Sequence, residues 1–448
     1  MVSPASATFD ATFAPRSQHG RAPRWRTAWR RSATTLLGTL VISAAAVSPV
    51  AADFDFPLQD QVLLTDIDPL TDAGLLGWSV AISNDLVAMG APFKDAQLGA
   101  AYLYRIDGNR DLQPVRDFDA GPATSLRRYG FNIVADGELL AVGGGGRNPI
   151  QIYRRSGNDY VLIKDLEIPD LTAQGVRVFN IGPVMDLEGG SLIVADSGAT
   201  VDGVGNAGVA LVFRQNTGGA NNWGLEDILK SPDGLGVFGR SVAIGNDIAV
   251  IGDDVEERAL LFERDGLSWI FSRLLEPVNQ NPQDRFGSSV AAEGDIIAVG
   301  AEVGNEAGSA SGSVHIFERD AGGEDEFGEV AEVVGSQGGF IDEFGASMRI
   351  REGVLAVGSP NGNRAYLFAV NRSTDTWREV AVVQPPPASN IRDFGRSVDY
   401  FRGSFVVGTE RWSNSSSLNF GAVFLFENEL VRRCNGFDIV FCDGFEGR

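Results

Sequence analysis

Cysteine, histidine and lysine are scarce in this sequence of 448 residues, which contains two Cys and two His. A zinc site rich in histidine and a Ser-His-Asp relay both need histidines that the chain does not offer, since one of the two, His19, lies near the N-terminus. Both cysteines, Cys434 and Cys442, lie near the C-terminus, where they form no pattern typical of a catalytic thiol. These absences argue against most hydrolase and zinc-enzyme chemistries.

Positive charge is also scarce, because 37 Lys and Arg stand against 59 Asp and Glu, for a formal net charge of −22. Without residues 1–52, which hold six Arg and one Asp, the chain keeps 31 basic and 58 acidic residues and a formal charge of −27. Such an acidic surface argues against binding to nucleic acid or anionic lipid through a basic patch. It is compatible with solubility outside the cell, with divalent cations and with neutral partners.

Residues 1–52 have the layout of a secretory signal peptide. A basic run between Arg16 and Arg31 precedes an apolar stretch over residues 33–52, and Val50-Ala51-Ala52 ends it just before Asp53. An uncleaved membrane anchor with the same flanks is the alternative. No later stretch is apolar over the length that a membrane span needs. We therefore expect export to the periplasm, the cell surface or the exterior, with no membrane insertion after the signal is cleaved.

One phrase recurs along the chain, and residues 238–252 show it most clearly as FGRSVAIGNDIAVIG. A Phe-Gly pair opens a short apolar segment, a turn follows, and a second apolar segment ends on Gly. Further copies begin at Leu76, Tyr129, Phe179, Phe286, Phe344 and Phe394. The glycine positions of these pairs are Gly77, Gly130, Asn180 in place of Gly, Gly239, Gly287, Gly345 and Gly395, at spacings of 53, 50, 59, 48, 58 and 50 residues.

A period near fifty residues without amphipathic helices predicts an all-β fold, a seven-bladed β-propeller with four-stranded blades over residues 53–428. In each copy a third apolar segment ends on an aromatic residue, as in Ala259-Leu-Leu-Phe262. Fourth segments often begin near an aromatic residue, which we interpret as packing between blades. These aromatic residues are Tyr160, Trp223, Trp269, Phe327 and Trp377.

The seventh copy stops after Phe426 without a fourth strand, whereas residues 59–66 precede the first copy as an extra apolar segment. We expect this N-terminal segment to complete the last blade and to close the ring, which would protect the blade edges.

The order Phe-Gly, Ser-Val, turn, Ala-Val-Gly-Ala-Pro resembles the FG-GAP repeat, the unit of the integrin alpha-chain propeller and of many secreted bacterial proteins. Gly90-Ala91-Pro92 keeps the last element of that pattern. The resemblance implies a seven-bladed propeller used mainly to bind partners, with calcium in some loops between second and third strands. The corresponding loops here lack an Asp-x-Asp-x-Asp-Gly run. Asp253, Asp254 and Glu256 are the first candidates for calcium ligands, with solvated loop charge as the alternative; no other cofactor is expected.

The fold and the resemblance predict a non-enzymatic binding or adhesion module that contacts a protein or glycan partner through loops at one rim. The longest loop insertions are residues 197–207, 302–312 and 410–420. Trp412 lies in the last of them and is the one Trp after residue 52 that we place outside packing positions. It is a candidate to stack on a sugar or to anchor a partner, or else it covers its own hairpin.

Two other functions stay open. A carbohydrate-active enzyme, a glycosidase or a lyase, would use two rim carboxylates and needs no histidine. A purely structural envelope protein would neither bind a ligand nor turn it over. His315 occupies a position that other copies fill with Tyr, Gln, Leu or Phe, so we interpret it as structural.

Residues 429–448 form a tail outside the repeats. In an exported protein its two cysteines, Cys434 and Cys442, are expected to form a disulfide that closes a small loop. The tail is then either a docking or sorting tag or simply a stapled chain end.

Overall fold

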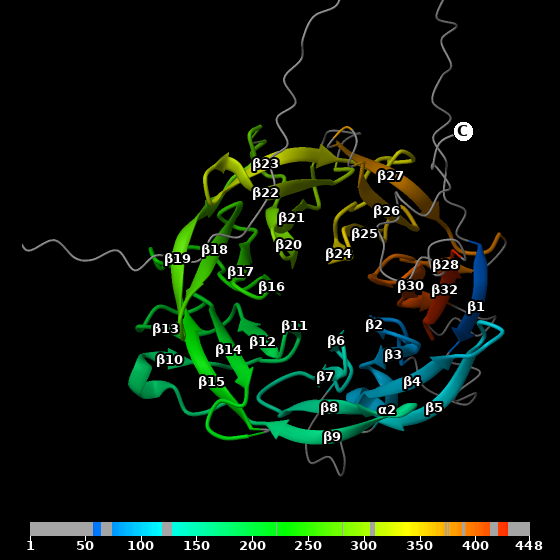
Figure 1. The fold of residues 1–448 in the computed structure, drawn as a ribbon, viewed down its shortest axis with the longest axis horizontal. Coiled ribbons are helices and arrows are strands. Elements are labelled where there is room, and N and C mark those ends of the chain that lie inside the picture. The colour runs from blue at the N-terminus through cyan, green and yellow to red at the C-terminus, as the bar shows by residue number, and fades with distance from the viewer. Residues whose placement is uncertain are drawn as a thin grey trace, which may run out of the picture. The chain divides into compact units, whose positions relative to one another are not determined.

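A computed structural model describes residues 57–63, 74–118, 128–220, 222–279, 281–304, 310–371, 374, 376–387, 390–412 and 420–428. These residues belong to one compact unit, Ala52–Arg448. Seven four-stranded antiparallel sheets stand around a central axis as the blades of a propeller (Figure 1). The predicted all-β, seven-bladed architecture is confirmed. Among the described residues no helix is long and apolar enough to cross a membrane.

The first four blades follow one another along the chain. Blade 1 consists of β2 (Ser79–Ser83), β3 (Leu86–Ala91), β4 (Ala100–Ile106) and β5 (Leu112–Phe118). Blade 2 consists of β6 (Asn132–Asp136), β7 (Leu139–Gly143), β8 (Ile150–Ser156) and β9 (Asp159–Leu166). Blade 3 consists of β11 (Val184–Glu188), β12 (Ser191–Asp196), β14 (Val209–Gln215) and β15 (Trp223–Leu229). Blade 4 consists of β16 (Ser241–Ile244), β17 (Ile248–Asp253), β18 (Arg258–Asp265) and β19 (Ser268–Leu275).

The last three blades complete the ring. Blade 5 consists of β20 (Phe286–Glu293), β21 (Ile296–Ala301), β22 (Ser313–Gly323) and β23 (Glu326–Val333). Blade 6 consists of β24 (Ser347–Arg351), β25 (Val354–Ser359), β26 (Arg364–Asn371) and β27 (Thr376–Val383). Blade 7 consists of β29 (Ser397–Phe401), β30 (Ser404–Thr409), β32 (Ala422–Glu427) and β1 (Leu58–Leu63).

Several short elements lie in the loops between the blade strands. Two pairs of two-residue strands join loops at the edge of the disc: β10 (Val176–Arg177) with β13 (Thr200–Val201), and β28 (Ile391–Arg392) with β31 (Arg411–Trp412). A helical turn α2 (Lys94–Gln97) and a 3-10 turn η1 (Thr172–Gln174) complete the described elements.

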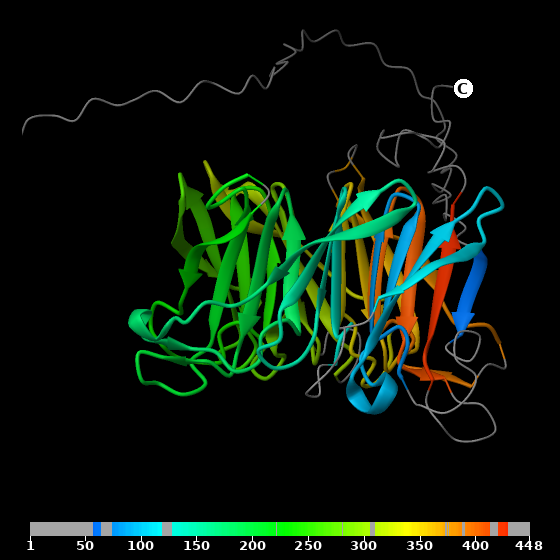
Figure 2. The ribbon, with the colours of Figure 1, turned by 90° about the horizontal axis from the view of Figure 1, so that it is seen from below.

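The two faces of the disc carry different connections (Figure 2). Each blade begins at its Phe-Gly pair or the equivalent, and its first strand runs along the central axis to a tight turn such as Asn84-Asp85. The second strand returns to the starting face. We call the face with the Phe-Gly pairs and the loops between second and third strands the Phe-Gly rim, and the opposite face the hairpin rim. Asn84 adopts a positive φ of 57°, which Asn tolerates in tight hairpin turns.

The N-terminal strand closes the ring. β1 pairs antiparallel with β32, with Cα partners from Leu58 and Phe426 to Leu63 and Ala422. It supplies the fourth strand that the seventh copy lacks, as predicted from residues 59–66, of which 64–66 lie outside the described residues. A closed ring leaves only the short outer edge of each blade unpaired.

The Phe-Gly, Ser and Val-Gly elements of the repeat join neighbouring blades, which explains why they recur. The Ser79 hydroxyl donates a hydrogen bond of 2.9 Å to the Gly130 carbonyl of the next blade. A Cβ added to Gly90 would lie 2.0 Å from the same carbonyl oxygen, so only glycine fits there. The same bond joins Ser241 to Gly287, Ser289 to Gly345, Ser347 to Gly395 and, across the closure, Ser397 to Gly77.

The third blade corrects one prediction. Its anchor is Ile181-Gly182, and not Phe179-Asn180. Ile181 is fully buried, as Phe238 is in the next blade, whereas Phe179 is 43% exposed. Gly182 has a φ of 107° and packs against the second strand of blade 2, as an anchor glycine does. The alignment failed because this copy has Ile181 in place of the anchor Phe, while another Phe, Phe179, lies two residues earlier.

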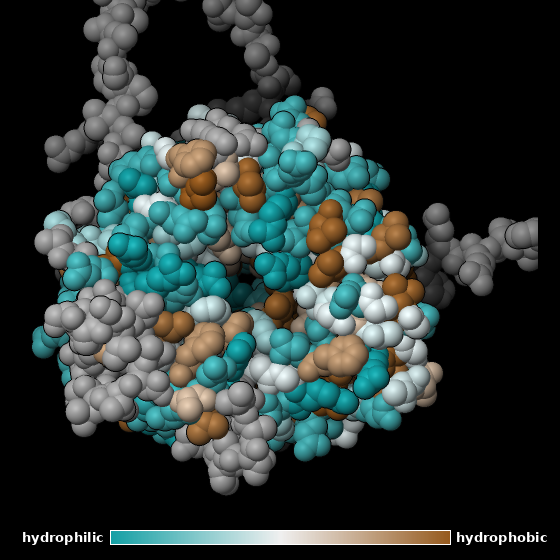
Figure 3. Space-filling view, turned by 180° about the vertical axis from the view of Figure 1, so that it is seen from behind, coloured by the Kyte–Doolittle hydropathy of each residue, from teal (hydrophilic) through white to brown (hydrophobic). Residues whose placement is uncertain are grey.

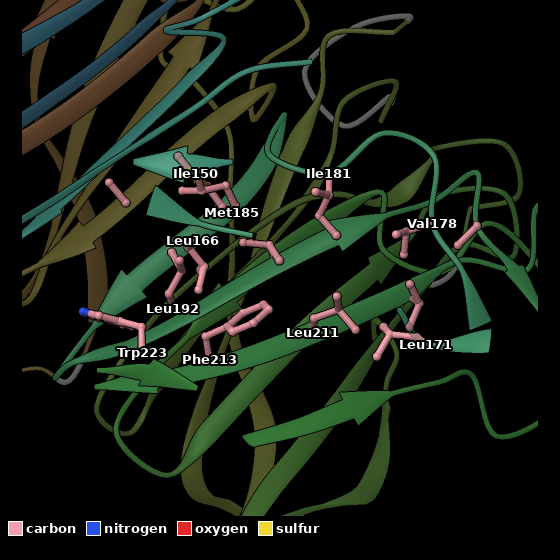
Figure 4. Close-up of a cluster of buried hydrophobic side chains, with 14 of the residues drawn as sticks. Ile150, Leu166, Leu171, Val178, Ile181, Met185, Leu192, Leu211, Phe213 and Trp223 are labelled. Atoms are coloured by element: carbon pink, nitrogen blue, oxygen red, sulfur yellow. The ribbon is translucent and has the colours of Figure 1, made fainter. Parts of the chain in front are cut away.

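The hydrophobic core lies between adjacent blades. Figure 4 shows the cluster between blades 2 and 3, which contains Ile150 and Leu166 from one blade and Leu192, Leu211 and Phe213 from the other. Trp223 at the start of β15 is 3% exposed, and Tyr160, Trp269 and Phe327 are similarly buried. The fourth-strand aromatic residues therefore pack between blades, as predicted. Full burial of each large apolar side chain contributes about 1.5–3 kcal/mol.

Candidate functional site

A cavity of about 370 Å³ lies on the central axis and is lined by residues of all seven blades. It is formed by the first strands, which stand closest to the axis. A hollow is visible at the centre of the disc in the space-filling view, with hydrophilic residues along much of its edge (Figure 3). Ligand sites in proteins commonly have volumes of about 300–1,000 Å³. This central cavity is the candidate functional site.

The mouth of the cavity is a ring with one residue from each blade, the residue that follows the anchor glycine. These seven residues are Trp78, Phe131, Pro183, Arg240, Ser288, Ala346 and Arg396. Blades 1 to 3 contribute an apolar side with two aromatic rings. Blades 4 to 7 contribute a polar side with two arginines. The mouth is therefore amphipathic.

The apolar side is built around Trp78. Its ring lies 5.0 Å from the ring of Phe131 and 5.2 Å from that of Phe93, measured between centroids. The guanidinium of Arg396 lies over the Trp78 ring at 4.5 Å. Trp78 is only partly buried, so its ring both packs on Phe131 of the next blade and lines the cavity. An aromatic face and a guanidinium together can hold a flat or cyclic ligand.

The polar side contains two carboxylates in different states. Arg285 donates hydrogen bonds to Glu302 and to Asp254, so the Glu302 carboxylate has a cationic partner. Burial and the nearby Glu302 carboxylate raise the pKa of Glu343, while Arg396 partly opposes that shift. Glu302 and Glu343 both line the cavity. The mouth thus offers one paired carboxylate and one that holds its proton more readily.

Three charged residues form the floor of the cavity. Arg349 of blade 6 donates a hydrogen bond to Asp186 of blade 3, and its Nε lies 3.9 Å from an oxygen of Asp399 in blade 7. Asp186 also accepts the Ile244 N–H at 3.0 Å, and Asp399 accepts the Ile82 N–H at 2.8 Å. The three side chains therefore tie five blades together around the axis. Burial would lower the pKa of Arg349, but the two aspartates outweigh it and raise the pKa, so Arg349 stays charged.

A second layer of charge lies deeper, toward the hairpin rim. Arg351 donates hydrogen bonds to the carbonyls of Ile82 and Ala135. On the opposite blade, burial and the Asp186 carboxylate raise the pKa of Glu188 to about 8, against a smaller opposing effect of Arg349. Below the floor the axis is therefore lined by an arginine that binds backbone carbonyls and by a carboxyl group that holds its proton more readily.

The residues proposed for calcium lie at the end of β17 and in the loop that follows. Asp253 is fully buried; its Oδ1 accepts the Val237 N–H at 2.9 Å, and its Oδ2 lies 3.3 Å from Arg258 Nε. Asp254 pairs with Arg285, and Glu256 is exposed. Within the described part of the chain, no three His, Cys, Asp or Glu side chains group as metal ligands would. In this structure Asp253 and Asp254 form ion pairs with Arg258 and Arg285, and calcium binding stays a prediction.

The long loop insertions begin on the Phe-Gly rim, where the second strands end, and residues 305–309 and 413–419 lie outside the described part of the chain. The insertion at residues 197–207 contains β13, which pairs with β10. Trp412 lies in β31, and its backbone pairs with Ile391. Its role toward a ligand stays a prediction. Cys434 and Cys442 lie outside the described residues, so the disulfide also stays a prediction.

His315 is 3% exposed, and its Nδ1 lies 2.8 Å from a carboxylate oxygen of Glu329, while its Nε2 lies 3.3 Å from the Ser313 hydroxyl. This order of groups resembles a hydrolytic relay, but Ser313 is fully buried and cannot meet a substrate. The arrangement supports the structural interpretation of His315.

The mouth ring and the charged floor were not predicted from the sequence, although each leaves a pattern in it. The residue after the anchor glycine varies from Trp to Arg, while the Ser that follows it is nearly constant. At the level of the floor most blades have Ala or Val, as at Ala81 and Ala243, whereas three blades have Asp186, Arg349 and Asp399. A charge in a column of small residues that face the axis predicts pairing across that axis.

The family comparison agrees with the repeat pattern of the sequence. A family model described as FG-GAP repeat matches residues 61–104 and 269–317. No curated protein matches the sequence significantly. Similar solved structures include a protein from Lactobacillus plantarum (14% identity, 69% of this chain and 84% of that chain covered, TM-score 0.46). They also include putative 6-phosphogluconolactonases from Bacteroides fragilis (13%, 69% and 84%, TM-score 0.44) and Bacteroides uniformis (11%, 68% and 88%, TM-score 0.45). With its Phe-Gly repeats folded into seven blades, this chain is a β-propeller protein that contains FG-GAP repeats.

Proposed function

We propose that this protein is an exported, non-enzymatic binding module that holds a saccharide unit of a glycan in the mouth of its central cavity. The observation that carries the proposal is the mouth ring. Its residues change chemistry from blade to blade, whereas the positions that join the blades remain nearly constant. Variable chemistry on a constant frame is typical of recognition.

The chemistry of the mouth suits a sugar. One face of a sugar ring presents C–H groups that stack on an aromatic side chain, which Trp78 and Phe131 offer. Its hydroxyl groups both donate and accept hydrogen bonds, which Glu302 and Arg240 can satisfy on the polar side. The volume of about 370 Å³ suits a small group and not a whole protein domain.

The test is binding of the protein to a glycan array, followed by titration of each retained glycan. We expect saturable binding that Trp78→Ala weakens about tenfold or more, because loss of a central aromatic contact typically costs more than 1 kcal/mol. Trp78→Phe keeps an aromatic face and should retain most of the affinity.

Phe401→Ala is the matched control, because Phe401 is a partly buried aromatic residue in the first strand of blade 7 at the opposite, hairpin end. It should leave glycan binding unchanged. An array without any hit, or a hit that Trp78→Ala does not weaken, would contradict the proposal and favour a structural envelope protein.

The pair of carboxylates supports a second candidate, a carbohydrate-active enzyme. A carboxylic acid with a raised pKa beside an ionised carboxylate is the arrangement that glycosidases use as acid and nucleophile or base. Glu343 would be the acid, and Glu302, which accepts a hydrogen bond from Arg285, the second carboxylate. Release of reducing ends from a bound glycan, lost in Glu343→Gln while binding persists, would establish this function in place of simple binding.

A further inference from the structure

Two grooves lie end to end on the Phe-Gly rim, apart from the central cavity. The first, of about 260 Å³, lies between the blade 3 loop at residues 201–208 and the segment at residues 230–234. The second, of about 290 Å³, lies between the blade 4 loop at residues 256–258 and the residues 274–279 and 281–284. Each groove therefore lies between the loop that follows the second strand and the segment that follows the fourth strand of its blade, blade 3 for the first groove and blade 4 for the second.

A single ion pair forms the wall between the grooves. Arg258, which lines the second groove, donates hydrogen bonds of 2.6 and 3.0 Å to Asp233, which lines the first. Its Nη2 also donates to the Leu235 carbonyl at 3.1 Å. Arg258 is 8% exposed, so this wall is a built part of the surface. We call the two grooves and this wall the rim trough.

Exposed aliphatic side chains accompany the rim trough along its length. Val204 is 52%, Leu235 56%, Val255 61% and Val278 77% exposed. Val204 lines the first groove, and each of the other three lies next in sequence to a lining residue. Blades 3 and 4 lie on the left in Figure 1 and therefore on the right in Figure 3, which shows the molecule from behind. Separate hydrophobic patches are visible on that side of the central hollow (Figure 3). Several exposed aliphatic residues beside one trough indicate an interaction surface.

The trough is also acidic. Its lining holds six carboxylates against one Lys and one Arg. These carboxylates belong to Asp202, Asp233, Glu256, Glu257, Glu276 and Asp284. Lys230 pairs with Asp202, and Arg258 pairs with Asp233, so both cations are already matched within the trough. The exposed carboxylates of Glu256 and Glu276 favour a cationic partner.

We propose that the rim trough binds an extended polypeptide segment of another protein, with alternating aliphatic and basic side chains. Aliphatic side chains would enter the two grooves, because side chains on one face of an extended segment lie about 6.5–7 Å apart and can straddle a thin wall. Basic side chains would meet the exposed Glu256 and Glu276. A glycan suits the trough less well, since the aromatic rings among its described lining residues, Phe286 and His315, are each 3% exposed.

The test is an array of synthetic extended peptides of three kinds, with alternating basic and aliphatic, acidic and aliphatic, or basic and polar residues, probed with the full chain. We expect selective binding of the basic and aliphatic peptides that weakens as salt rises. Equal binding of the acidic and aliphatic peptides, or no binding of any peptide, would overturn the proposal.

Variants then locate the binding. Leu235→Ser and Val255→Ser remove exposed side chains without changing the charge, and each should weaken peptide binding about fivefold or more. Leu267→Ser is the matched control, because Leu267 is 78% exposed in the β18–β19 turn of the same blade, at the hairpin rim. Peptide binding that Leu267→Ser weakens as much as Leu235→Ser would also overturn the proposal.

A double substitution of two carboxylates tests whether charge contributes to peptide binding. Glu256→Gln combined with Glu276→Gln should lower the affinity several-fold and flatten its dependence on salt. Trp78→Ala, which affects the central mouth, should leave peptide binding unchanged. Peptide binding at the rim trough and glycan binding at the mouth can therefore be confirmed or contradicted separately.

Discussion

Arg349 is the single residue on which the charged floor of the cavity depends. It lies between two aspartates, Asp186 and Asp399, that are each 4% exposed. Arg349→Met would leave Asp186 buried without its counter-charge, whereas Asp399 would keep Arg351, whose Nε lies 3.8 Å from one of its oxygens. Removal of one partner from a buried ion pair typically costs about 3–5 kcal/mol.

We therefore expect Arg349→Met to lower the free energy of unfolding by about that amount in urea denaturation. Adding Asp186→Asn to the same chain should recover part of the loss, because one uncompensated charge is removed. An unchanged urea midpoint in Arg349→Met would show that the charged floor contributes nothing to stability.

Glu188 makes the stability depend on pH. Burial and Asp186 raise its pKa to about 8 in the folded protein, above the value near 4.3 of an unfolded chain. Because the folded state binds this proton more tightly, its contribution to stability is present in full below pH about 4.3 and is lost as pH rises to about 8. Glu188→Gln should flatten this decline by on the order of 2–4 kcal/mol.

The measurement is urea denaturation of both proteins between pH 5 and 9. The two stabilities should lie closest at pH 5, and Glu188→Gln should be the more stable protein at pH 9. Parallel pH profiles would contradict a raised pKa at Glu188.

At the scale of strands, the joint between neighbouring blades depends on glycines that have no room for a side chain. A Cβ at Gly408 of β30 would lie 2.2 Å from the Gly77 carbonyl oxygen across the ring closure, and backbone cannot move away as a flexible side chain would. Gly108, in the β4–β5 turn, has open space around its Cα. Gly408→Ala should therefore lower the thermal midpoint by several degrees, whereas Gly108→Ala should change it little. Equal midpoints for the two variants would show that this close approach is not needed.

The same strand joints explain which elements the sequence could predict. Ser397 and Gly77 lie 320 positions apart and meet through one hydrogen bond, yet both belong to a repeated phrase that marks their positions. Blade 3 has Pro183 and Val184 where the other blades have a variable residue and a Ser or Asn, and there the alignment slipped by two residues. Prediction succeeded where the joint repeats and failed where a blade uses other side chains.

For the whole molecule, the closure by β1 decides whether the ring is complete. A chain that begins at residue 70 lacks β1 and exposes the edge of β32, whose hydrogen-bonding groups would then lack partners from Leu58–Leu63. We expect this shorter chain to melt at a lower temperature and to self-associate through the open edge. Differential scanning calorimetry and sizing by light scattering measure both effects, and a monomer that melts like the full chain would contradict the role of β1.

The sequence by itself determined the number of blades, their order of strands and the closure, because the Phe-Gly, Ser and Gly positions recur in most copies to make the same joint between neighbouring blades. Only the tertiary structure decided what those blades bring together. Trp78 and Arg396 lie 318 positions apart and stack at the mouth, and Arg349 reaches Asp186 from the opposite side of the ring. In a closed ring, two residues meet when they lie at the same depth along the axis, even if their blades are far apart in the sequence. The site therefore emerged from the fold, although the fold itself was already apparent in the repeat.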